Sequence, residues 1–106
     1  MLDATRKVSE YTEGLDAESF WADSMVQDAV LRNLEIIGEA AKRVPDAIRD
    51  QASEISWREV CGFRDVIVHD YDAIDLEVVW DVIANEVPGL LESLEILMED
   101  LSDSVG

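Results

Sequence analysis

The chain has 106 residues, of which 25 are Asp or Glu and 8 are Lys or Arg, so its formal net charge is −17. This length fits one domain, residues 1–106, with a real but not a generous hydrophobic core. The negative charge opposes nonspecific binding to nucleic acids, which depends on basic patches, and no run of about 18 apolar residues is present to span a membrane.

The first half of the chain is typical of helices and contains no alternating strand pattern. We predict a first helix from Leu2 to Glu13, which ends before Gly14. A second helix is predicted from Ser19 to Val44, and of the two aromatic residues near its start, Phe20 and Trp21, we expect one to pack and the other to be exposed. The apolar residues of this helix recur at three-, four- and seven-residue steps, which predicts one buried stripe of Val26, Val30, Ile37, Ala41 and Val44.

A short third helix is predicted from Pro45 to about Ala52, because proline fits the first turn of a helix. Ser56 and Glu59 then form a capping-box pattern, in which Ser56 is the N-cap and Glu59 reaches back to it. This pattern opens a fourth helix, which carries Arg64 and ends near His69.

Asp75 is predicted to cap a fifth helix that begins at Leu76. Pro88 interrupts or kinks this helix, which continues from Gly89 to about Leu101, and residues 102–106 fray. The expected fold is therefore all-α, an antiparallel bundle of four to five helices.

The acidic residues are spread along the whole chain rather than gathered in a tail. Self-repulsion on this scale destabilises a compact state in dilute buffer, whereas about 1 M salt shortens the screening length to about 3 Å. We therefore expect a halophilic protein from a high-salt cytoplasm. The alternative is an ordinary acidic protein that binds a basic partner.

Two further features of the sequence concern location and metal binding. The N-terminal residues lack a hydrophobic signal core, so a cytoplasmic protein is expected. The single cysteine, Cys61, cannot form an intrachain disulfide and is expected to be a small buried apolar residue. No cluster of Cys and His offers a metal site, and we expect no cofactor.

The segment 63–71 holds the only histidine, His69, five residues after Arg64 and two before Tyr71. Histidine, with an unperturbed pKa of about 6.5, exchanges protons near neutrality, and an arginine can hold a phosphate with two hydrogen bonds. The tyrosine hydroxyl can donate, accept or be modified. These residues indicate phosphodiester chemistry without a metal. The alternative is structural: Arg64 pairs with one of the many acids and His69 ends a helix.

A regular helix does not place this arginine and histidine on one face. Residues five apart lie about 140° apart around the helix axis. A helix end near His69 could turn that side chain toward Arg64. Alternatively, a two-fold dimer could bring two copies of the segment into one cleft.

Several segments carry a resemblance to a known family. They are Tyr11–Gly14, Phe20, Ala29–Ala41, Ser56–Trp57 and Arg64–Tyr71. Together they resemble the HEPN superfamily, and within it the HepT-like toxins that are paired with minimal nucleotidyltransferases of the MntA type. The resemblance covers nearly the whole chain. It implies a dimeric helical bundle with a metal-independent RNase site at the dimer cleft, where Arg and His cleave RNA, commonly tRNA.

The resemblance also implies a role for each residue of the motif. Arg64 would bind the scissile phosphate, and His69 would act as general base or acid on the ribose 2′-hydroxyl or the leaving oxygen. Tyr71 would accept AMP from the partner nucleotidyltransferase. The family often has asparagine after the arginine; here Asp65 would repel RNA but could orient His69. Glu39, in the Gly-Glu-Ala segment, is either a supporting residue or an ordinary inter-helix partner of an arginine.

Two functions remain open at this point. In the first, the chain is an RNase toxin of a toxin–antitoxin pair, silenced by AMP transfer to Tyr71. In the second, it is a noncatalytic module that binds the nucleotidyltransferase and regulates it without cutting RNA. Both predict a homodimer and a nucleotidyltransferase partner, and only the first requires an RNA substrate.

Overall fold

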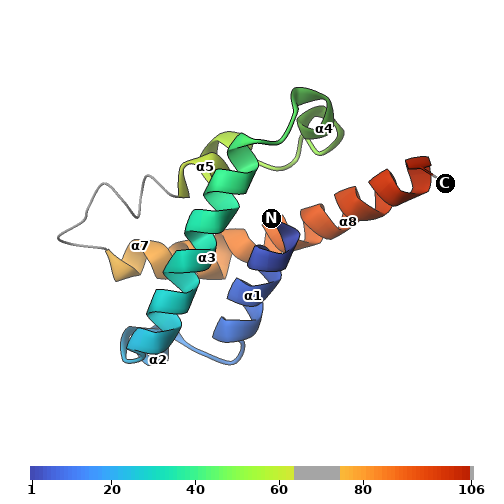
Figure 1. The fold of residues 1–106 in the computed structure, drawn as a ribbon. Coiled ribbons are helices and arrows are strands. Elements are labelled where there is room, and N and C mark those ends of the chain that lie inside the picture. The colour runs from blue at the N-terminus through green and yellow to red at the C-terminus, as the bar shows by residue number, and fades with distance from the viewer. Residues whose placement is uncertain (64–74, 106) are drawn as a thin grey trace.

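The computed structural model describes residues 1–63 and 75–105, and every regular element in these ranges is a helix (Figure 1). The elements are α1 Leu2–Thr12, α2 Ala17–Trp21, α3 Ser24–Lys42, α4 Asp46–Gln51, α5 Trp57–Cys61, α7 Leu76–Asp81, the π-helix η1 Val82–Glu86, and α8 Val87–Val105. The all-α prediction is confirmed for these residues. The expected number of four to five helices is not confirmed: caps divide residues 17–42 into α2 and α3, and a π-helix separates α7 from α8 within one continuous run.

The helices α1 and α3 form the centre of the fold. Figure 1 shows them side by side and antiparallel, with the continuous run α7–η1–α8 crossing them. The helix α1 also packs against α8. The helix α5 packs against α3. The position of α5 matters for function, because α5 leads directly into the segment that carries the predicted site.

The buried stripe predicted for the second helix is confirmed. Val30, Ile37 and Ala41 have no solvent exposure, and Val26 and Val44 are partly buried against the same core. These residues face a core that also contains side chains from α1, α5 and α8. The helix periodicity therefore reported the buried face correctly.

The two aromatic residues at the start of that segment also behave as expected. Phe20 is fully buried, whereas 43% of Trp21 is exposed. The Phe20 ring packs against the ring of Trp80, with a centroid distance of 5.4 Å. This contact fixes α2 against α7.

The prediction of one unbroken helix from Ser19 to Val44 is wrong. Asp16 caps α2 by accepting a 2.8 Å hydrogen bond from the Ser19 amide, and this bond lowers the pKa of the Asp16 carboxyl. Asp23 caps α3 by accepting a 3.2 Å hydrogen bond from the Val26 amide. At the start of each helix the aspartate accepts a hydrogen bond from a backbone amide that would otherwise have no partner. The chain therefore forms two helices instead of one.

Pro88 does not interrupt the C-terminal helix, which also continues past the predicted end, through Val105. In a regular α-helix a proline lacks the amide hydrogen and clashes with the carbonyl four residues earlier. Here the preceding residues, Val82–Glu86, form a π-helix, whose wider turn shifts the hydrogen bonds and accommodates the ring. The predicted cap of α7 is confirmed, because Asp75 Oδ1 accepts a 3.0 Å hydrogen bond from the Glu77 amide.

The start of α5 differs from the predicted capping box. Ser56 occupies the N-cap position, but its side chain makes no capping hydrogen bond. The buried Trp57 anchors this helix instead: its indole Nε1 donates a 3.1 Å hydrogen bond to the carbonyl of Ala52. Burial of a large ring with its one donor satisfied fixes the helix start without the serine.

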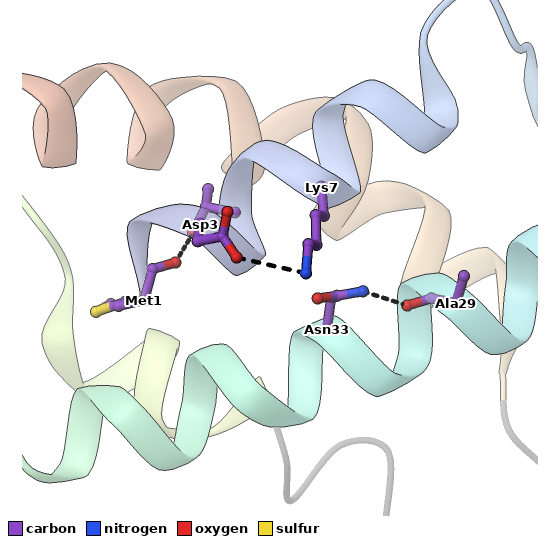
Figure 2. Close-up of polar contacts among 6 residues, drawn as sticks. Met1, Asp3, Lys7, Ala29 and Asn33 are labelled. Carbon is purple, nitrogen blue, oxygen red and sulfur yellow. Dashed lines mark hydrogen bonds and ion pairs between the residues drawn. The ribbon is translucent and has the colours of Figure 1, made fainter.

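Polar side chains at the contact between α1 and α3 serve the fold. Figure 2 shows Asn33 projecting from α3 toward α1. Its side-chain amide donates a 2.8 Å hydrogen bond to the carbonyl of Ala29 on the same helix, α3. On α1, the fully buried Thr5 donates a 2.9 Å hydrogen bond to the Met1 carbonyl. Each group is satisfied by its own helix, as buried polar groups generally must be. These two donors therefore stabilise their own helices.

Ion pairs compensate little of the negative charge. Those between described residues are Arg6–Glu95 at 3.6 Å, Lys7–Asp3 at 3.4 Å (Figure 2) and Arg32–Glu35 at 3.9 Å. Each lies at the surface, where such a pair contributes about 0–1 kcal/mol. Among residues 1–63 and 75–105, no helix combines the length and apolar character needed to cross a bilayer.

We expect the protein to be more stable in concentrated KCl than in dilute buffer, because screening weakens the repulsion among the excess carboxylates. The measurement is the melting temperature by circular dichroism at about 0.1 M and about 2 M KCl. KCl is preferred to a sulfate salt, since sulfate strengthens apolar burial in any protein. A lower melting temperature in the concentrated salt would contradict the halophile hypothesis.

Candidate functional site

Four of the five predicted site residues lie outside the described part of the chain: Arg64, Asp65, His69 and Tyr71. The structure fixes both ends of the segment that carries them. On one side Phe63 is buried, with 6% of its surface exposed, and on the other side α7 begins behind its Asp75 cap. The roles of these four residues therefore remain predictions, and the structure describes their surroundings.

Glu39 is the one predicted site residue that the structure describes. It lies on α3, two residues from both Ile37 and Ala41, whose side chains are fully buried. Two residues correspond to about 200° around a helix, so Glu39 projects away from the core stripe. Its side chain is nevertheless half-buried, its Oε1 atom is inaccessible to solvent, and it takes part in an interaction within the fold. Its supporting role stays a prediction.

Arg49, on α4, joins three elements next to the predicted site. Its Nη2 donates a 2.8 Å hydrogen bond to the Ala41 carbonyl, and its Nε donates a 3.0 Å bond to the Val44 carbonyl. The same Nη2 lies 3.9 Å from Cys61 Sγ, and the guanidinium lies 5.8 Å from the centre of the Trp57 ring. Arg49 thus satisfies carbonyls at the C-terminal end of α3 and holds α5 against that helix end.

Sequence reasoning missed Arg49, because no local pattern connects it to Trp57 or Ala41. Arg49 joins α4 to the C-terminal end of α3 and to α5. Cys61, which was expected to be a buried apolar residue, is only partly buried and faces this guanidinium. Trp57 belongs to the hydrophobic core.

We expect Arg49→Ala to destabilise the protein by about 2–3 kcal/mol, because it removes charge-assisted hydrogen bonds from partly buried carbonyls. Arg43→Ala is the matched control: Arg43 is an exposed arginine at the end of α3 with no ion pair to any described residue, so its effect should be within about 0.5 kcal/mol. Urea unfolding measures both. Equal effects of the two substitutions would show that the contacts of Arg49 are not stabilising.

A pocket of about 290 Å³ lies beside Phe63. Its apolar lining comes from the loop before α5, from the α5 segment and from α8: Ile55, Val60, Phe63 and Leu90. Its acidic lining comes from three different elements: Glu54, Glu59 and Glu86. None of the lining residues that the structure describes is basic, so within residues 1–63 and 75–105 the pocket combines an apolar surface with acidic groups.

Glu59 and Glu86 face each other across this pocket. Partial burial raises the pKa of the Glu86 carboxyl, and the hydrogen bond with Glu59 and the repulsion from that carboxylate raise it further. Repulsion from Asp81 adds to the effect. The carboxyl groups of Glu59 and Glu86 therefore interact directly, and their like charges account for part of the raised pKa of Glu86.

A second pocket, of about 420 Å³, lies further along α8 and is lined mainly by apolar residues of α1, α3, α4 and α8. Asp3 and Arg43 are its only charged lining residues among those described. It has little polar chemistry to offer a phosphate. Within residues 1–63 and 75–105 no group of three His, Cys, Asp or Glu side chains is arranged to hold a metal ion.

Comparisons with known proteins agree with the resemblance seen in the sequence. A family described as "Ribonuclease HepT-like" matches residues 1–97. A protein of Thermococcus cleftensis named "probable ribonuclease HepT" is 37% identical over 95 residues, which cover 90% of this chain and 86% of that protein.

A longer relative comes from Methanocaldococcus jannaschii and is named "gamma-glutamylcyclotransferase and putative RNase". It is 35% identical over 101 residues, which cover 95% of this chain but 46% of that protein. The chain thus spans about half the length of this relative. No solved structure matches the chain.

Proposed function

Because the chain belongs to the ribonuclease HepT-like family, we propose that it is an endoribonuclease, the toxin of a toxin–antitoxin pair. The observation that carries the proposal is the family match over residues 1–97, a range that includes Arg64, His69 and Tyr71 at the motif spacing. The RNase names of the relatives support the same activity. The substrate in this proposal is RNA, with tRNA as the expected class.

The proposed chemistry uses two side chains and no metal. His69 takes the proton of the ribose 2′-hydroxyl, or gives one to the leaving oxygen, and Arg64 balances the charge that develops on the scissile phosphate. Glu39 and Asp65 are proposed to support this pair. The described residues nearest to this segment in the sequence are packed: Phe63 is buried, and Arg49 contacts Trp57 of α5.

The pair is proposed to act at the cleft of a two-fold dimer, with the helices that begin after Ser56 near the axis. Light scattering in concentrated KCl should then give about twice the chain mass of 11.9 kDa. The salt is required because two chains of charge −17 repel each other in dilute buffer. A strict monomer at micromolar concentration would remove the composite site.

Expression of the chain alone tests the proposal against its alternative. An RNase toxin should arrest growth, and the purified protein should cleave tRNA in the presence of EDTA. A noncatalytic module that regulates a nucleotidyltransferase should do neither. The negative charge and Asp65 favour this second candidate, because both oppose the approach of RNA.

A further inference from the structure

The pocket beside Phe63 has the dimensions of a receptor for one long side chain. Its volume of about 290 Å³ is at the lower limit of sites that enclose a small molecule. Val60, Phe63 and Leu90 supply a continuous apolar surface inside it. Such a surface favours an aliphatic stem, whereas the acidic groups at the pocket favour a charged end.

The wall formed by α8 contains a glycine. Gly89 is an exposed residue inside this helix, and a Cβ atom placed on it would meet no atom within 4 Å. Glycine inside a helix lowers helix stability by about 1 kcal/mol relative to alanine. At this position no neighbouring atom is close enough to require the absence of a side chain. A side chain at this position would therefore have room beside the pocket.

The charges of the pocket determine the kind of occupant. Glu59 comes from α5 and Glu86 from η1, and folding brings their carboxyl groups together without a basic lining residue among those described. A planar guanidinium can donate to two carboxylates at once, whereas an ammonium group acts as a point charge. Arginine therefore matches this pair better than lysine does.

We propose that this pocket receives an arginine side chain of a partner protein, with the guanidinium bridging Glu59 and Glu86 and the methylenes packed on Val60, Phe63 and Leu90. A second copy of this chain is a poorer occupant, because two surfaces of the same strong negative charge repel each other. The inference goes beyond the proposed ribonuclease activity and does not depend on it.

A pair of short peptides tests the proposal on the full chain. One is acetyl-Ala-Arg-Ala-amide, and the other replaces the arginine by citrulline, which keeps the shape but lacks the charge. The readout is the amide spectrum of ¹⁵N-labelled protein at the lowest KCl concentration that keeps it folded. We expect saturable shifts at Phe63 and Gly89 with the arginine peptide, and at least about tenfold weaker binding of the citrulline peptide.

Two substitutions separate the charge of the pocket from its shape. Glu86→Gln should weaken binding of the arginine peptide about tenfold, while Glu99→Gln, at an exposed position of α8 outside both pockets, should leave it unchanged. Gly89→Leu should fill the pocket and abolish the shift at Phe63, while Gly89→Ala should retain binding. Circular dichroism of each variant checks that it is folded.

Three results would overturn the proposal. Equal binding of both peptides would show that charge does not select the occupant, and equal binding to the Glu86→Gln protein would place the contact elsewhere. A halved molar mass of the Gly89→Leu protein in light scattering would identify the occupant as a second copy of this chain. None of these readouts involves RNA cleavage, so they are independent of the catalytic assignment.

Discussion

Replacing His69 by alanine is expected to reduce RNA cleavage by about 10²–10⁴-fold, because proton transfer by a positioned side chain contributes a factor of this size. The loss should appear in the rate with purified tRNA and as normal growth of cells that express the variant. His69 is the only histidine of the chain, so no second imidazole can replace it. Circular dichroism should show a fold that is unchanged.

Arg64→Lys is expected to fail as well, although it conserves the charge. The ammonium group cannot reproduce the planar fork that binds two phosphate oxygens. Arg58→Lys is the matched control, because Arg58 is an exposed arginine of the adjoining α5 and has no ion pair to any described residue. This variant should keep its activity. Undiminished cleavage by both the His69→Ala and Arg64→Lys proteins would show that the motif is structural.

Tyr71→Phe is expected to produce a toxin that its partner cannot silence. The substitution removes only the hydroxyl that would accept AMP, so RNA cleavage should continue. Coexpression with the nucleotidyltransferase should therefore rescue cells that carry the unaltered chain, but not cells that carry the variant. In the presence of the nucleotidyltransferase, cells with the unaltered chain should grow, whereas cells with the Tyr71→Phe chain should arrest.

In the proposed silencing, the phosphate of AMP on Tyr71 would compete with RNA for Arg64. AMP on Tyr71 adds a phosphate seven residues after Arg64, and that phosphate can occupy the guanidinium that RNA needs, as a phosphorylated side chain does opposite an arginine. It also adds negative charge to a strongly acidic chain, which raises the free energy of bringing RNA close.

Mass spectrometry after incubation with ATP, magnesium and the nucleotidyltransferase should show one or more AMP units on the peptide that contains Tyr71. Tyr11→Phe is the matched control, because Tyr11 is the only other tyrosine and 41% of its surface is exposed. It should be modified and silenced normally. If the Tyr71→Phe protein gains the adduct equally, the acceptor is wrongly assigned and Tyr11 becomes the remaining tyrosine to test.

Local patterns determined much of this fold from the sequence. The repeat of Val30, Ile37 and Ala41 identified the buried face of α3, and Asp75 was correctly placed as the cap of α7. Such signals succeed because helix hydrogen bonds, caps and side-chain periodicity involve residues within about one or two turns. The motif of Arg64, His69 and Tyr71, with the family resemblance, likewise came from the sequence, and the chain's membership in the family is now shown.

Other features depended on contacts between residues that are far apart in the chain. Nothing near Arg49 in the sequence indicated that it would contact Ala41 and Trp57, and Glu59 and Glu86 meet only because α5 packs near η1. Pro88 is tolerated because the preceding turn widens into a π-helix, whereas the sequence alone suggested an interruption. The sequence therefore determined most of the helices and the candidate chemistry. Tertiary packing decided which charges of the described residues lie together, because packing brings residues from different helices into contact.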